Sequence, residues 1–162
     1  MALSQPQQMF SRRFIAVLIA AVCLLPALQS CSHKKKVYQS NCNIDKTFKL
    51  VTFKQLIDHL SDYDRQYIEV SGRYEEGKGL SALFSDSLFT GKSDPNALWV
   101  NFSQDCPLYL TGTHKGLFEY VDGSFSQINN KPVVIRGMID LHNKGYRNRC
   151  KATIDRVSLV KL

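Results

Sequence analysis

The sequence lacks the short motifs that identify common classes of enzyme and metal protein. Its five cysteines never form a CxxC pair, so neither a thiol–disulfide catalyst nor a zinc ribbon is indicated. Its four histidines show no HExxH or HxxxH spacing, and no serine lies in a GxSxG motif. Asp62–Asp64 (DYD) lacks the glycine and glutamate of a calcium loop and is typical of a helix-ending turn. We therefore predict no metal site, no cofactor and no catalytic residue.

The excess of positive over negative charge is small over most of the chain, although the net charge of the whole chain is +7. Arg12, Arg13 and the run Lys34–Lys36 contribute five of these charges, which leaves +2 for the remainder. Nucleic-acid binding depends on basic surface, and a nearly neutral body offers little of it. We therefore expect no nucleic-acid partner.

No apolar run is long enough to cross a bilayer. The longest, Phe14–Leu25 (FIAVLIAAVCLL), has twelve residues, whereas a membrane-spanning helix needs about 20. Such a length is usual for the hydrophobic core of a signal peptide, and Arg12 and Arg13 lie on its N-terminal side, as in such peptides. Pro26 then ends the helix before a cleavage region. The pattern predicts that residues 1–30 are an export signal.

The four residues after this run resemble the lipobox of bacterial lipoproteins. Leu28–Cys31 (LQSC) has an aliphatic residue three places before the cysteine and a small residue next to it. The resemblance implies that the Cys31 thiol receives diacylglycerol and that cleavage makes Cys31 the first residue of the mature chain. Gln29 departs from the family pattern, which more often has a small residue there. Ser32 implies, in lipoproteins of the enterobacterial type, sorting to the outer membrane instead of the inner membrane.

Two other interpretations of this segment remain open. A conventional signal peptidase could cut after Ser32 and discard Cys31, or the apolar run could stay attached as an anchor. Under the lipoprotein interpretation, residues 31–46 carry the lipid and then form a flexible basic tether. Lys34–Lys36 would then lie at the level of the lipid headgroups, and the domain would face the periplasm or the exterior.

Residues 47–162 are predicted to form a single β-rich domain that begins with a helix. Thr52 is a favourable N-cap for a helix of about nine residues. Its apolar positions at helical spacing are Phe53, Leu56, Ile57 and Leu60. The apolar period then changes to two, which indicates strands. The five predicted strands are Tyr67–Tyr74, Leu80–Phe84, Ala97–Phe102, Lys131–Leu141 and Lys151–Leu162.

Gly72 and Gly137 occupy matching positions in two of these strands (QYIEVSGRY and KPVVIRGMI), where a glycine indicates a bulge or a bend. Small closed barrels need such bends at their corners. Three strands, an irregular segment with a short helix at His114–Val121, and two further strands resemble the order of the OB-fold. The resemblance covers residues 66–162 and predicts an α+β, mostly β, fold, a small five-stranded OB-like barrel preceded by a short amphipathic helix. A sandwich or another α+β arrangement stays open.

Tyr74, Phe84 and Trp99 lie on the three strands that form the ligand-binding face of OB-folds. The resemblance implies that these rings could stack on sugars, although Trp99 also suits a core position. Because an exported protein rarely meets nucleic acid, the expected ligand is an oligosaccharide, a peptide or an envelope protein.

Three cysteines remain if Cys23 leaves with the signal and Cys31 is lipidated. In an oxidising compartment, Cys42, Cys106 and Cys150 allow three different single bridges and leave one thiol over. Cys106–Cys150 is the first choice because both residues flank strands of the β-domain. Cys42 could instead attach the tether to the domain.

The leading hypothesis is a bacterial lipoprotein of the cell envelope that presents a small β-barrel binding module at a membrane surface. Two alternatives remain, a small exported enzyme whose site is dispersed in the sequence and a conventionally secreted structural protein of the envelope. A fold by itself does not decide among them.

Replacing Cys31 by serine tests the lipid anchor. We expect Cys31→Ser to abolish incorporation of radiolabelled palmitate and to move the protein from the membrane fraction to the soluble fraction, because firm attachment needs two or more acyl chains. The control Cys23→Ser should be labelled as the unchanged chain is. A Cys31→Ser protein that stays in the membrane and is cleaved as before would contradict the anchor.

Overall fold

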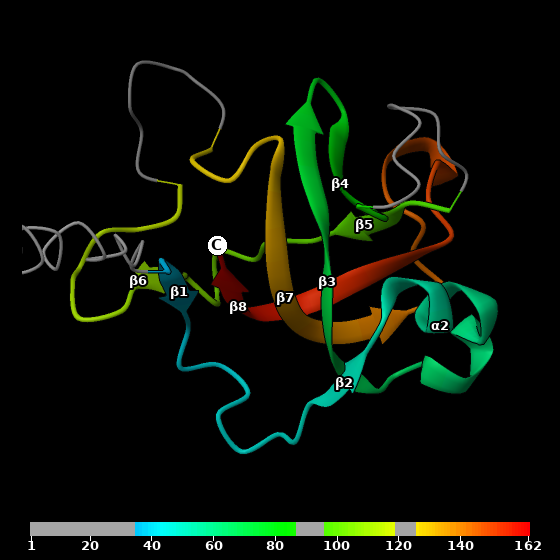
Figure 1. Cartoon of the computed structure of the whole chain (residues 1–162), viewed down its shortest axis with the longest axis horizontal. Coiled ribbons are helices and arrows are strands. Elements are labelled where there is room, and N and C mark those ends of the chain that lie inside the picture. Colours follow the sequence, from blue (N-terminus) through cyan, green and yellow to red (C-terminus); the bar gives the residue numbers. More distant parts are fainter. Residues whose placement is uncertain (1–34, 87–95, 119–125) are drawn as a thin grey trace, which may run out of the picture. The chain divides into compact units, whose positions relative to one another are not determined.

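The computed structural model describes residues 35–86, 96–118 and 126–162. They belong to a compact unit, Lys35–Leu162, in which strands dominate (Figure 1). The strands are β1 Val37–Gln39, β2 Lys49–Val51, β3 Tyr67–Gly77, β4 Leu80–Phe84, β5 Leu98–Val100, β6 Tyr109–Leu110, β7 Lys131–Asp140 and β8 Ala152–Lys161. The helices are α2 Phe53–Asp58 and the 3₁₀ segments η2 Leu60–Tyr63 and η3 Tyr146–Asn148. Within these ranges, no helix combines the length and apolarity that crossing a bilayer requires.

Five of the strands close into a barrel with the ring order β3-β4-β5-β8-β7, and β7 pairs back to β3. All neighbours are antiparallel except β5 and β8, which run parallel. The β3–β7 ladder extends from Tyr67↔Met138 to Tyr74↔Lys131. The predicted five-stranded barrel is therefore confirmed, and each predicted strand is present with its ends shifted by at most three residues.

The interior of the barrel is filled by alternate residues of its strands, as the period of two predicts. Eight branched side chains of the barrel strands are completely buried in this core: Ile68, Val70, Leu83, Leu98, Ile135, Ile139, Ile154 and Val160. Each such burial contributes roughly 1.5–3 kcal/mol relative to an exposed side chain. Ala82 and Phe84 on β4 face the other way and form a second, smaller cluster with Ala97, which precedes β5, and Cys150, which precedes β8.

Two glycines allow the barrel walls to approach each other. A Cβ on Gly137 would lie 2.5 Å from Ile154 Cγ2 and 2.7 Å from the Asp155 carbonyl oxygen. The register between β7 and β8 shifts at this point, and β7 curves strongly along its length (Figure 1). A Cβ on Gly72 would lie 2.5 Å from the carbonyl oxygen of Phe84. Both positions therefore require glycine because neighbouring backbone occupies the space of a side chain.

The predicted helix is present as α2, which continues into η2. Its first turn is closed by a capping box, in which Thr52 Oγ1 accepts from the Gln55 backbone N–H and the Thr52 N–H donates to Gln55 Oε1. Phe53 and Leu56 point into the main core. The helix is shorter than predicted because the chain tightens into the 3₁₀ segment after His59.

The prediction that residues 31–46 form a flexible tether is wrong from β1 onward. β1 pairs with β8 at Val37↔Lys161 and with β6 at Tyr38↔Leu110. Tyr38 is a core residue with 2% of its surface exposed. The segment looks like a linker because a three-residue strand with a single buried aromatic shows no periodicity in the sequence.

The predicted Cys106–Cys150 bridge is also wrong. Cys106 forms a disulfide with Cys42, with a Cα–Cα distance of 5.7 Å, and Cys150 is a buried free thiol in the second cluster. The reason is that Cys106 lies in the loop after β5, beside the N-terminal segment that β1 attaches to the barrel. The bridge joins residues that are 64 positions apart in the sequence. In the chain-entropy description, a disulfide that closes a loop of that length stabilises the fold by about 4 kcal/mol.

Substituting the corner glycine tests the steric origin of the barrel. Gly137→Ala should lower the free energy of unfolding by about 1–3 kcal/mol, because the added methyl overlaps Ile154 and the Asp155 backbone. Gly77→Ala is the matched control, since nothing lies within 4 Å of its Cβ, and it should change stability by less than about 0.5 kcal/mol. Urea denaturation of both proteins measures the difference. Equal losses would show that Gly137 is not a close-contact position.

Thiol alkylation without reductant tests the cysteine pairing. Cys150 should react only after unfolding, because 6% of its surface is exposed and burial raises the pKa of its thiol to about 11. Peptide mass mapping of the unreduced chain should recover Cys42 linked to Cys106. A peptide that links Cys106 to Cys150 would contradict this arrangement.

Candidate functional site

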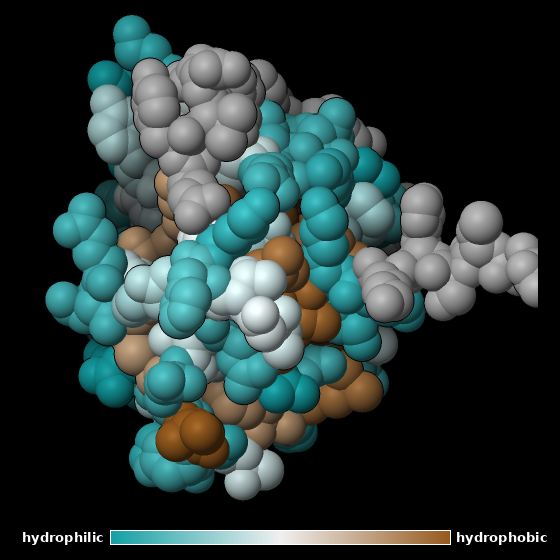
Figure 2. All heavy atoms as spheres, turned by 90° about the vertical axis from the view of Figure 1, so that its left-hand side faces the viewer, coloured by the Kyte–Doolittle hydropathy of each residue, from teal (hydrophilic) through white to brown (hydrophobic). Residues whose placement is uncertain are grey.

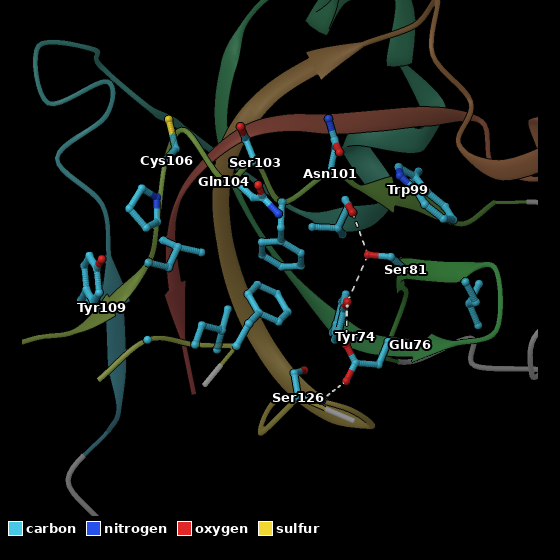
Figure 3. A pocket seen from close by; sticks show the side chains of 18 of the residues that line it. Tyr74, Glu76, Ser81, Trp99, Asn101, Ser103, Gln104, Cys106, Tyr109 and Ser126 are labelled. Atoms are coloured by element: carbon cyan, nitrogen blue, oxygen red, sulfur yellow. Dashed lines mark hydrogen bonds between the residues drawn. The ribbon is translucent and has the colours of Figure 1, made fainter. Parts of the chain in front are cut away.

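An open cavity with a volume of about 930 Å³ lies beside β3, β4 and β5 (Figure 3). Its walls come from the β3–β4 hairpin, from the loop that follows β5 and from the turn that follows β6. The volume is in the range of sites that hold small molecules or short polymers. On the neighbouring face, which carries β1 and β6, apolar side chains show at the surface between polar ones (Figure 2).

Aromatic rings make up much of the cavity lining. They are Tyr74, Trp99, Phe102, Tyr109 and Phe118. Phe102 contacts Tyr74 and Phe118 edge to face, with ring centroids 5.7 Å and 4.9 Å apart. Phe118 is 51% exposed and Tyr109 is 45% exposed. Two rings therefore remain open to solvent, where they can stack on a ligand.

A hydrogen-bonded group of polar side chains lies at the β3–β4 side of the cavity (Figure 3). The Tyr74 hydroxyl donates to Glu76 Oε2 at 3.2 Å and lies 3.1 Å from Ser81 Oγ. The Ser81 hydroxyl donates to the Val100 carbonyl oxygen at 2.7 Å. Glu76 Oε1 accepts from the backbone N–H of Ser126. Burial raises the pKa of Tyr74, so Tyr74 keeps its proton at neutral pH and serves as a donor.

The lining is nearly uncharged. It contains no lysine or arginine among the described residues, and Glu76 is its only carboxylate there. Asn101, Ser103 and Gln104 supply neutral polar groups, and the Asn101 amide donates to Asp155 Oδ1 at 2.9 Å. One carboxylate does not supply the pair that glycoside hydrolysis uses. Ser81 donates to a carbonyl oxygen, which does not activate its hydroxyl as a nucleophile.

Two of the three predicted ligand-face aromatics line the cavity. Tyr74 and Trp99 do so, whereas Phe84 is 1% exposed and belongs to the second core cluster. The prediction for Phe84 is wrong because alternation along β4 places Phe84 on the face opposite Leu83, where residues near Cys150 cover it.

The predicted helix at His114–Val121 is absent over residues 114–118, and its last three residues lie outside the described ranges. Residues 109–117 instead form a tight turn, in which Leu110 N–H donates to the Lys115 carbonyl and Leu117 N–H to the Leu108 carbonyl. This turn forms one wall of the cavity. Sequence reasoning missed Glu76, Phe102 and Phe118 because no local pattern marks residues that meet only in the folded chain.

A second cluster lies at the end of β7. One oxygen or nitrogen from each of Asp64, Asp140 and His142 falls within 4.8 Å of the others. Asp64 Oδ1 accepts from the Leu141 N–H, and Asp140 Oδ1 accepts from the His142 N–H. The bond from the His142 N–H lowers the pKa of Asp140. We assign the cluster to holding the turn after β7.

Comparison with known proteins returned no matching family model, curated protein or solved structure. The interpretation of the cavity therefore depends on its own geometry and chemistry.

Proposed function

We propose that this chain is a lipid-anchored binding protein of the bacterial cell envelope whose cavity takes an uncharged oligosaccharide. The observation that carries this proposal is the combination, in one open cavity, of solvent-exposed aromatic rings with amide and hydroxyl groups, and without lysine or arginine among the described lining residues. Sugar rings present apolar faces that stack on aromatic rings and hydroxyl groups that pair with amides and carboxylates. A short neutral peptide is the alternative occupant.

The barrel supports the proposal through its strand order. A closed ring of five strands, β3-β4-β5-β8-β7, is consistent with the OB-fold resemblance of residues 66–162, and the cavity adjoins β3, β4 and β5. OB-folds commonly bind oligosaccharides or oligonucleotides at this face. The lack of lysine and arginine in the described lining favours an oligosaccharide over an oligonucleotide, because phosphate backbones are bound through lysine and arginine.

The lipid anchor is supported by the lipobox resemblance at Leu28–Cys31. Since the fold begins at Val37, the chain from Cys31 to β1 can extend only about 20 Å. The anchor would therefore hold the barrel close to the membrane surface, and Lys34–Lys36 would lie among the headgroups. An anchored binding module fits the site better than an enzyme, because Glu76 and His114, which both line the cavity, share no hydrogen bond within the described part of the chain.

The single tryptophan of the chain provides the test, because Trp99 lines the cavity. Neutral oligosaccharides, for example oligomers of N-acetylglucosamine, should change Trp99 fluorescence in a saturable manner. Phe118→Ala should weaken binding by about tenfold or more through the loss of one stacking surface. Phe118 is 51% exposed, so the substitution spares the core.

Leu50→Ala is the matched control, because Leu50 is 75% exposed on β2 and lies outside the cavity lining. It should leave the affinity unchanged. Equal effects of the two substitutions, or no saturable change with any neutral oligosaccharide, would overturn the proposal. Cleavage of a bound oligosaccharide would favour the enzyme alternative.

A further inference from the structure

The segment between β7 and β8 concentrates positive charge. Residues 142–151 (HNKGYRNRCK) contain no acid, and their four cationic side chains are all exposed. They are Lys144, Arg147, Arg149 and Lys151. Lys78, in the β3–β4 turn, is a fifth exposed cation near this segment, because Gly79 packs against Tyr146, where a Cβ on Gly79 would lie 2.9 Å from the tyrosine ring. We name these five cations the basic surface.

The charge of the basic surface is not neutralised within the described residues. Four lysines and arginines elsewhere in the described residues form ion pairs, among them Arg73 with Asp86 and Arg136 with Glu69. None of the five cations of the basic surface forms an ion pair with any residue of the described ranges. The pKa of Asp58 is lowered chiefly by its hydrogen bond with Lys54, which is also its ion-pair partner, and only slightly by the charge of Lys151. The positive charge is therefore available to a partner.

The segment is held in one conformation by its neighbours. The Thr153 hydroxyl donates to the Asn143 carbonyl at 2.8 Å, and the Cys150 N–H donates to the Lys144 carbonyl at 3.1 Å. Gly145 has a φ of +70° and lies so close to Trp99 that a Cβ would fall 2.3 Å from its ring. A fixed loop loses less conformational entropy on binding than a flexible one.

Trp99 joins the basic surface to the cavity. One part of its ring packs against Gly145, and Trp99 also lines the cavity. Next to it, Tyr146 is 49% exposed and Arg147 lies over its ring at 5.1 Å. A polymer in the cavity can therefore continue past Trp99 onto an aromatic ring surrounded by cations.

The basic surface lies at the end of β8 opposite to the one that pairs with β1. β8 begins directly after it at Ala152 and ends at Lys161, which pairs with Val37. A ten-residue strand spans about 30 Å. Figure 1 shows β1 on the left and the orange segment between β7 and β8 on the right. The basic surface therefore lies far from Val37, the first residue of β1.

We propose that the basic surface binds the phosphate or carboxylate groups of an acidic glycan, with neighbouring sugar rings in the cavity. This inference rests on the proposed function for the sugar subsite, and it adds to the sugar segment in the cavity a neighbouring part of the same polymer that carries negative charges. Charge-assisted hydrogen bonds from arginine and lysine to such groups are strong, and exposed cations next to exposed aromatic rings suit a chain that alternates anions and sugar rings.

The test compares defined probes on the full mature chain in detergent, namely oligogalacturonate as the acidic sugar polymer and dextran as the neutral one. Oligogalacturonate should bind more tightly than dextran, and its affinity should fall as salt rises from about 50 to about 300 mM. Arg149→Gln/Lys151→Gln should weaken oligogalacturonate binding about tenfold. The matched control Lys35→Gln/Lys36→Gln removes the same charge near β1 and should have little effect.

Four outcomes would overturn the inference. They are oligogalacturonate binding no tighter than dextran, equal effects of the two double variants, tighter binding to a DNA oligonucleotide than to the acidic sugar, and a loss of binding to phosphatidylglycerol vesicles caused by Arg149→Gln/Lys151→Gln but not by the control. Unchanged thermal unfolding of both variants verifies that they fold. If neutral sugars bind in a manner that depends on Phe118 and the acidic sugar is not preferred, this inference is wrong and the cavity proposal stands. If the acidic sugar binds in a manner that depends on the basic surface but not on Phe118, the cavity proposal alone is wrong.

Discussion

The close backbone approach at Gly137 is the constraint on which the structure depends. β7 pairs with β3 over residues 131–138 and with β8 over residues 134–140, and it bends where it passes Ile154 and Asp155. This bend closes the ring and places β8 beside β5 in the parallel direction. Closure in turn brings the β3–β4 hairpin, the loop after β5 and the start of β8 to one region. The cavity and the basic surface both form there. The cavity draws on several stretches of chain, whereas the basic surface comes from residues 142–151 together with Lys78.

The N-terminal segment joins the barrel through β1, beside the last residues of β8. β1 pairs with the end of β8, and the Cys42–Cys106 disulfide fastens the residues after β1 to the loop that forms one wall of the cavity. Under the proposed anchor, only the residues between Cys31 and Val37 remain to separate the barrel from the bilayer. The cavity wall, the disulfide and the anchor are thus connected through a few residues. This arrangement would present the opposite end of β8, with its cations, to the space beyond the membrane.

Net charge conceals the most distinctive electrostatic feature of the domain. Outside the N-terminal segment and Lys34–Lys36 the net charge of the chain is only +2, which suggests a surface with no preference for charged partners. The folded chain instead neutralises charges locally through pairs such as Arg136–Glu69 and leaves residues 142–151 without acids. A sum over the sequence measures the total and not its distribution, and binding of charged partners depends on the distribution. The described residues that line the adjacent cavity include no lysine or arginine, in contrast to this surface.

Features that arise between neighbours in the chain were determined by the sequence itself. The Thr52 cap, the strands with a period of two and the glycines at Gly72 and Gly137 follow from local hydrogen bonding and sterics, and each was predicted. The partner of Cys106, the face occupied by Phe84 and the pairing of β1 were decided only by the tertiary structure. They depend on which distant segments become adjacent when the barrel closes, and local periodicity carries no information about that. For the same physical reason, the cavity around Glu76 and Phe118 exists only in the folded chain.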